Sequence, residues 1–190
     1  ILPSTTYLMD PINIHRRKWL ALGGAAMGMA MLPGQALATL STPRPRILLL
    51  NNLNTGEQLK AEFFDGKNYI QEELVRLNHL FRDYRANKVK SIDPRLFDQI
   101  FRLQAMIGTR KPIQLISGYR SPRTNNELRE RGSGVAKHSY HTLGQAMDFH
   151  IEGVQLANIR KAALKMRAGG VGYYPRSNFV HIDTGPVRNW

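Results

Sequence analysis

Residues 138–148 read His138-Ser139-Tyr140-His141-Thr142-Leu143-Gly144-Gln145-Ala146-Met147-Asp148. The polar first half is typical of a loop, and the alternating apolar second half predicts a strand over 145–151. Alternation places Asp148 and His150 on one face of that strand and the larger apolar side chains on the other. A carboxylate in an apolar strand must find a partner there, because an unpaired buried charge is costly.

A second segment supplies candidate partners for Asp148. Residues 179–183, Phe-Val-His-Ile-Asp, predict another strand, with His181 and Asp183 on one face. If the two strands are neighbours, His141, Asp148 and His181 converge on one point. Two imidazoles and a carboxylate can bind one Zn²⁺ per chain and leave a fourth position for water. In the alternative interpretation, Asp148 forms an ion pair with Arg120 and the histidines are structural.

The rest of the chain predicts an α+β fold in which helices pack on a small, mostly antiparallel sheet. Further strands are expected over 47–50, 57–64, 113–116 and 171–174. Helices are expected over 69–85, 94–107, 125–131 and 156–166. Asp93-Pro94 is typical of a helix start, Gly108 of a helix end, and Gly169-Gly170 is expected to end the last helix.

The first 38 residues are expected to be a signal peptide preceded by extra residues. A basic segment, His15-Arg16-Arg17-Lys18, precedes an apolar run from Trp19 to Leu32, and Ala36-Leu37-Ala38 fits a cleavage site. The run has 14 residues, fewer than the 18 or so that a spanning helix needs. The paired arginines favour a twin-arginine signal over an ordinary Sec signal. Translation is expected to start at Met9, and the exported domain at Thr39, with no membrane span after cleavage.

Composition limits the chemistry and the partners. The chain has no cysteine, which excludes disulfides, thiol catalysis, lipoprotein anchoring and Cys-ligated zinc. Its net charge is +13, of which the first 38 residues contribute only +2. The basic residues are spread along the chain instead of forming a stripe, which argues against nucleic acid. An anionic wall polymer is the partner that charge and export favour together.

The motifs resemble those of a known enzyme family. His-x-x-Gly-x-Ala-x-Asp at 141–148, followed by His-x-Asp at 181–183, is similar to the signature of zinc D-Ala-D-Ala metallopeptidases and related murein endopeptidases. Residues 117–121 resemble the upstream Arg motif of the family, and residues 137–141, 170–174 and 181–188 resemble the murein endopeptidase K (MepK) branch. This resemblance covers residues 39–190 and implies the zinc D-Ala-D-Ala metallopeptidase (hedgehog/DD-peptidase) fold.

The resemblance also implies roles for individual residues. By position in the motif, His141, Asp148 and His181 match the zinc ligands, and Arg120 matches the arginine that contacts a substrate carbonyl or carboxylate. The implied enzyme is a periplasmic zinc peptidase that acts on peptidoglycan stem peptides. Members of the branch cleave D-Ala–diaminopimelate and diaminopimelate–diaminopimelate cross-links.

The general base is the position where the chain departs from its relatives. Several relatives place a Glu three residues, or a His two residues, before the last zinc ligand, and here those positions hold Asn178 and Phe179. Asp183 is therefore the first candidate. Its alternative role is to accept a hydrogen bond from a ligand histidine and fix the tautomer. His138 and His150 are further candidates.

Tyrosines gather in the same segments of sequence. Tyr119, Tyr140 and Tyr174 are expected to line the substrate groove, with ordinary half-buried aromatics as the alternative. Two rival functions stay open beside the endopeptidase. One is a D-Ala-D-Ala carboxypeptidase that trims uncross-linked stems, and the other is a murein-binding protein without turnover. The residues give no prediction of oligomeric state.

Overall fold

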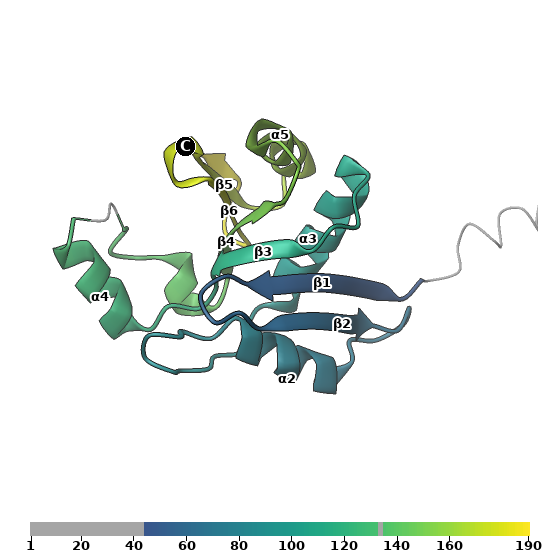
Figure 1. The fold of residues 1–190 in the computed structure, drawn as a ribbon, viewed down its shortest axis with the longest axis horizontal. Helices are drawn as coiled ribbons and strands as arrows, with labels where there is room; N and C mark the ends of the chain where they lie inside the picture. Colours follow the sequence, from purple (N-terminus) through teal and green to yellow (C-terminus); the bar gives the residue numbers. More distant parts are fainter. Residues whose placement is uncertain (1–43, 133–134) are drawn as a thin grey trace, which may run out of the picture. The chain divides into compact units, whose positions relative to one another are not determined.

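The structure is a computed structural model that describes residues 44–132 and 135–190 (Figure 1). The predicted signal peptide and residues 39–43 lie outside the described residues. The described strands are β1 (Arg46–Asn52), β2 (Gln58–Phe64), β3 (Ile113–Ser117), β4 (Ala146–Ile151), β5 (Gly170–Tyr174), β6 (Phe179–Asp183) and β7 (Arg188–Asn189). The α-helices are α2 (Gln71–Leu80), α3 (Pro94–Ile107), α4 (Pro122–Glu130) and α5 (Leu156–Met166). Two short 3₁₀ helices, η2 (Tyr140–Leu143) and η3 (Pro175–Ser177), complete the set.

The strands form one sheet in the order β2-β1-β3-β4-β6-β5-β7. The α+β class is confirmed, but the expectation of a mostly antiparallel sheet is wrong, because the sheet is mixed. β1 pairs with β3 in parallel, and so does β5 with β7. The first parallel pair arises because the chain between β1 and β3 passes through β2, α2 and α3 before it returns, and such long crossovers deliver parallel strands. The second arises from β7, which the sequence pattern did not predict.

The two faces of the sheet have different roles. Helices α3 and α5 lie against one face, and α2 packs beside β2 (Figure 1). On that face the strands bury apolar side chains in the core, among them Leu48, Phe63, Leu115, Phe149 and Ile182. The residues between them point to the opposite face, which therefore carries the polar side chains of β4 and β6. The alternation predicted for 145–151 and 179–183 is confirmed.

Helix ends follow local hydrogen bonding. Asp93 caps α3 by accepting from the backbone N–H of Arg95, and Gly108 ends it in the left-handed region with φ of 75°. Both were predicted. Helix α4 begins at Pro122, earlier than expected, because the Ser121 side chain caps it by accepting from the N–H of Thr124.

One predicted helix end and one predicted helix cap were wrong, although the bounds of α5 match the prediction. Helix α2 stops at Leu80 instead of 85, because Asp83 is buried and accepts the N–H groups of Arg85 and Ala86 in a turn. Aspartate competes with helix in this way when its side chain replaces the next helical acceptor. Helix α5 ends with Arg167 in the left-handed region, with φ of 50°, and Gly170 instead begins β5. Among the residues that the structure describes, no helix has both the length and the apolar character for crossing a membrane.

Candidate metal centre

Three side chains from three elements converge on the polar face of the sheet. Strands β4 and β6 are antiparallel neighbours, and Asp148 lies directly opposite His181. Asp148 Oδ1 is 2.8 Å from His181 Nδ1, and Asp148 Oδ2 is 3.2 Å from His141 Nε2. The two ring nitrogens are 3.3 Å apart. Ligands of a tetrahedral zinc ion at about 2.0–2.1 Å lie about 3.3 Å from one another, so two of these separations match such an ion and the Asp148–His181 contact is shorter.

His141 reaches this point because a short 3₁₀ helix places it there. Ser139 caps η2 by accepting from the N–H of His141, and Gly144 ends it in the left-handed region with φ of 72°. The N–H of Arg120 donates to the backbone oxygen of His141 at 3.1 Å. The 117–121 segment and the histidine turn are therefore held side by side, although they are 20 residues apart in sequence.

The outer nitrogen of each imidazole has its own acceptor. His141 Nδ1 lies 2.7 Å from the oxygen of Gly118, and His181 Nε2 lies 3.1 Å from Asp183 Oδ2. Both acceptors require an N–H there, so in the neutral imidazoles the lone pairs are on Nε2 of His141 and Nδ1 of His181. These lone pairs and the Asp148 carboxylate face one another. A cation between them satisfies all three, so the donor set fits a metal ion.

Without a bound cation, the electrostatics act differently on the three groups: burial lowers the pKa of His181, but its hydrogen bonds to Asp148 and Asp183 outweigh this, so the net shift is upward. Burial lowers the pKa of His141, which favours the neutral imidazole. Burial by itself raises the pKa of Asp148, but its contacts with His141 and His181 outweigh it, so the net shift is downward. The carboxylate therefore stays ionised and balances part of the charge of a divalent ion.

Arg120 lies beside Asp148 but is not its closest partner. Its guanidinium is 3.7 Å from Asp148 Oδ2, longer than a hydrogen bond, and it is 9% exposed. Burial lowers the pKa of Arg120, and the opposite charge of Asp148 counters this. Of the two interpretations of Asp148, the contact distances favour the one in which imidazoles are its main partners.

Asp183 is fully buried behind His181. Its Oδ2 accepts from His181 Nε2, and its two oxygens accept both terminal nitrogens of Arg188, at 3.1 and 2.6 Å. The N–H groups of Gly170 and Gly185 donate to Oδ1. Burial raises the pKa of Asp183, but the hydrogen bonds from His181, Arg188 and the backbone outweigh it, so the net shift is downward.

The chain matches a known family over nearly all of its described length. The family described as "Peptidoglycan L,D-endopeptidase MepK" matches residues 40–190. The chain belongs to this family. The resemblance predicted from the motifs is thereby confirmed.

Relatives named as MepK are similar along almost the whole chain. "Peptidoglycan L,D-endopeptidase MepK" of Escherichia coli (strain K12) is 76% identical over 182 residues, which is 96% of this chain and 100% of that protein. The protein of the same name from Shigella flexneri shows the same identity and coverage. "Probable peptidoglycan L,D-endopeptidase MepK" of Haemophilus influenzae is 49% identical over 96% of this chain and 98% of its own length.

The remaining predicted site residues are two further histidines and three tyrosines. His138 is exposed on the loop before η2, and His150 is on β4, two residues beyond Asp148, with its Nδ1 buried and unpaired among the described residues. Tyr119 packs partly against the core. The Oη of Tyr174 accepts from Trp190 Nε1 at 2.6 Å, and the Tyr140 ring lies under the Arg188 guanidinium.

Two residues of the site were not predicted from the MepK-like motifs. Arg188 binds Asp183, and the Trp190 ring lies 5.3 Å from that of His181, centroid to centroid. The signal that could have found them is the alternation Arg-Asn-Trp at 188–190, which places both side chains on one face of a short strand. Two strand residues among polar neighbours are too short a pattern to predict from periodicity.

Proposed function

We propose that this chain is a zinc peptidase that hydrolyses peptide cross-links of peptidoglycan at the His141, Asp148 and His181 centre. The observation that carries the proposal is that His141, Asp148 and His181 turn their ligand atoms toward one point. Hydrogen bonds on the outer side of the two imidazole rings hold them in that orientation. Membership of the MepK family supplies the substrate class, and it implies the zinc D-Ala-D-Ala metallopeptidase fold. Zinc is the ion that best suits two imidazoles and one carboxylate at tetrahedral spacing.

The chemistry is hydrolysis of an amide. When bound, zinc supplies a water molecule with a pKa near 7 and polarises the scissile carbonyl. The side chains of the protein hold the ligands in position, bind the substrate and transfer a proton. Gly118 and Asp183 fix the two imidazoles, and Arg120 stands next to Asp148 with its planar donors available to a substrate carbonyl or carboxylate.

The contacts of Asp183 favour the orienting role over that of general base. Its oxygens accept five hydrogen bonds, and the ring of His181 separates it from the metal-facing nitrogen. A base must reach the proton it removes within about 3 Å or through one water molecule. His138, exposed three residues before His141, stays the candidate for this step, and Tyr140 and Tyr174 stay candidates for lining the groove.

The name of the relatives narrows the choice of bond. The bond between two diaminopimelate residues joins an L-configured carbonyl to a D-configured amine, whereas D-Ala–diaminopimelate joins two D centres. Relatives named as L,D-endopeptidases therefore favour the diaminopimelate–diaminopimelate cross-link for this chain. Such a substrate lies outside the cytoplasm, which agrees with the proposal of a twin-arginine signal in residues 1–38 and a periplasmic domain over 39–190.

The decisive test is a chromatographic digest of purified muropeptide dimers of both cross-link types. The protein is incubated with zinc, with a chelator, and with the chelator followed by added zinc. Conversion of diaminopimelate-linked dimers to monomers in the two zinc-containing reactions supports the proposal. Conversion that is unaffected by the chelator contradicts a metal peptidase.

The rival functions give different products in the same assay. A carboxypeptidase releases free D-Ala from uncross-linked pentapeptides and leaves dimers intact. A binding protein holds zinc and sediments with cell-wall sacculi but forms no product. His141→Ala is the matched variant, because it removes one ligand from a short 3₁₀ turn and leaves the side chains of the apolar core in place, so it should abolish product formation.

A further inference from the structure

Strand β7 brings two side chains to the back of the candidate metal centre. It runs parallel to β5, with Arg188 beside Gly170 and Asn189 beside Val171. Two backbone hydrogen bonds fix the next residue, since the N–H of Trp190 donates to Val171 and the N–H of Tyr173 donates to Trp190, both at 3.2 Å. Arg188 and Trp190 therefore point to the same face of the sheet, the one that carries His181.

The neighbouring strand is built to receive these two side chains. A Cβ atom on Gly170 would lie 2.4 Å from Asp183 Oδ2 and 2.5 Å from a nitrogen of Arg188. A Cβ atom on Gly172 would lie 2.8 Å from the Trp190 indole. All three distances are shorter than real Cβ contacts, so Arg188 and Trp190 can lie where they do against β5 because glycine occupies positions 170 and 172. Each glycine of the Gly-Val-Gly sequence in β5 thus leaves room for one large side chain of the Arg-Asn-Trp sequence in β7.

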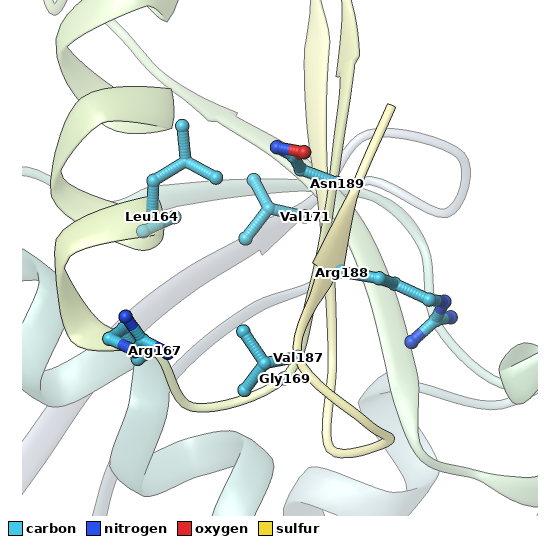
Figure 2. A pocket seen from close by; sticks show the side chains of 8 residues that line it. Leu164, Arg167, Gly169, Val171, Val187, Arg188 and Asn189 are labelled. Carbon is cyan, nitrogen blue, oxygen red and sulfur yellow. The ribbon is translucent and has the colours of Figure 1, made fainter.

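The opposite face of β7 is different in character. A hollow of about 290 Å³ lies between α5 and this sheet edge. In Figure 2, Leu164, Val171 and Val187 point toward it, while the Arg188 side chain points away. The hollow therefore belongs to the helix side. The guanidinium of Arg188 instead lies on the metal side, between the rings of Tyr140 and Trp190, at 4.7 and 5.2 Å from their centroids.

We propose that β7 is a positioning element for His181, in which Arg188 clamps Asp183 and Trp190 covers the imidazole ring. This inference rests on the proposed metal centre, to which it adds the residues that set metal affinity. The two-pronged contact of Arg188 holds both oxygens of Asp183, so that Oδ2 faces His181 Nε2 and keeps Nδ1 turned to the metal. Trp190 covers one side of the same ring, which is 8% exposed.

The test measures metal affinity directly, by competition with a chromogenic chelator for Zn²⁺ and Co²⁺. Arg188→Met keeps the length of the side chain and removes its charge, and it should weaken both ions 10–100-fold, the usual effect of losing a partner of a ligand histidine. Arg188→Lys, which can hold only one oxygen at a time, should fall between. Arg76→Met is the matched control, because it removes an exposed Arg–Glu pair on α2 and should leave affinity unchanged.

A double-mutant cycle distinguishes positioning from general stabilisation. If Arg188 acts through Asp183, the Asp183→Asn and Arg188→Met changes are not additive, and the double variant binds no more weakly than Asp183→Asn alone. Additive losses of metal affinity would contradict the proposal that Arg188 acts through Asp183. If Arg188→Met fails to fold, as judged by circular dichroism and melting of the metal-free protein, Arg188→Lys and Trp190→Phe carry the same affinity test.

Trp190 also supplies a spectroscopic readout. The chain has two tryptophans, and Trp19→Phe in the full chain leaves Trp190 as the only one. Co²⁺ at His181 should quench its fluorescence with the same midpoint as the affinity titration. If the chain binds no Zn²⁺ or Co²⁺, the proposed metal centre fails together with this inference. If it binds them with unquenched fluorescence and unchanged affinity in Arg188→Met, only the inference about β7 fails.

Discussion

Replacing Asp183 by Asn separates the two roles that the sequence left open for this residue. The carboxylate accepts three hydrogen bonds at Oδ1 and two at Oδ2, all from N–H donors. An amide keeps one acceptor oxygen and turns the other into a donor group. Whichever way Asn is placed, its NH₂ group faces at least two donors, and the contact with Arg188 loses its charge.

The expected size of the effect follows from these contacts. A buried donor left without an acceptor costs about 1–3 kcal/mol, and breaking a buried ion pair costs about 3–5 kcal/mol. The two terms overlap because Arg188 contributes to both. The Arg188 side chain is 38% exposed, so water can solvate its charge and the lower end of the range for a broken ion pair applies. We expect the free energy of unfolding of the metal-free protein to fall by about 3 kcal/mol, and metal affinity to fall 10–100-fold.

The assay is urea unfolding in excess chelator, followed by a metal competition titration on the same preparation. Asp98→Asn is the matched control, because Asp98 accepts from Arg46 and Tyr69 away from the metal centre. It should lose stability but keep its metal affinity. If Asp183→Asn keeps its stability within about 1 kcal/mol, binds zinc as tightly as the parent and yet loses all activity, Asp183 is the general base and the orienting role is wrong.

Three further predictions concern metal, pH and salt. Zinc at 1,000 times its Kd adds about 4 kcal/mol of stability, so removing it should lower the Tm by about 8–16 °C in calorimetry; an unchanged Tm would show that the folded state holds no metal. Burial raises the pKa of Asp83, but hydrogen bonds from Thr124 and Ser121 outweigh it and the net shift is downward. Its contribution to stability is therefore complete above about pH 4 and is lost as pH falls through the lower folded-state pKa, so urea unfolding of Asp83→Asn should show a deficit at pH 7 that shrinks at pH 3. Because the net charge is +13, sedimentation with anionic sacculi should weaken steadily between 50 and about 500 mM salt, and a flat profile would argue against electrostatic recruitment.

Local patterns predicted the elements that form the site. The alternation in 145–151 and 179–183 placed Asp148 and His181 on matching faces, and the structure pairs them directly. The start and end of α3 were also predicted, because capping by Asp93 and Gly108 depends on residues within one turn. These features share one property: the deciding contacts are close in sequence.

The errors arose where distant contacts decide. The mixed sheet depends on a crossover between β1 and β3, and the end of α2 depends on Asp83, which also accepts the N–H of Ser121, 38 residues away. Gly170 looked like a helix cap, since glycine commonly ends helices. In the structure it is glycine because Asp183 and Arg188 lie against it. A single sequence shows which residue is present but not which neighbour requires it.

Long-range contacts also decide the role of the two histidines. Each one alone fits a structural role, and only the contacts of both together favour a metal site. Each imidazole has a buried acceptor for its outer nitrogen, which would be enough for a structural role. Without a cation, Asp148 gains a donor here only if His181 is protonated at Nδ1, and the lone pair of His141 Nε2 still faces the carboxylate at 3.2 Å. Arg120, at 3.7 Å from Asp148, is too far away to supply that donor. A cation at the centre satisfies all three groups at once, so the hydrogen bonds of the three residues, counted together, support the proposed metal site more strongly than any one residue does.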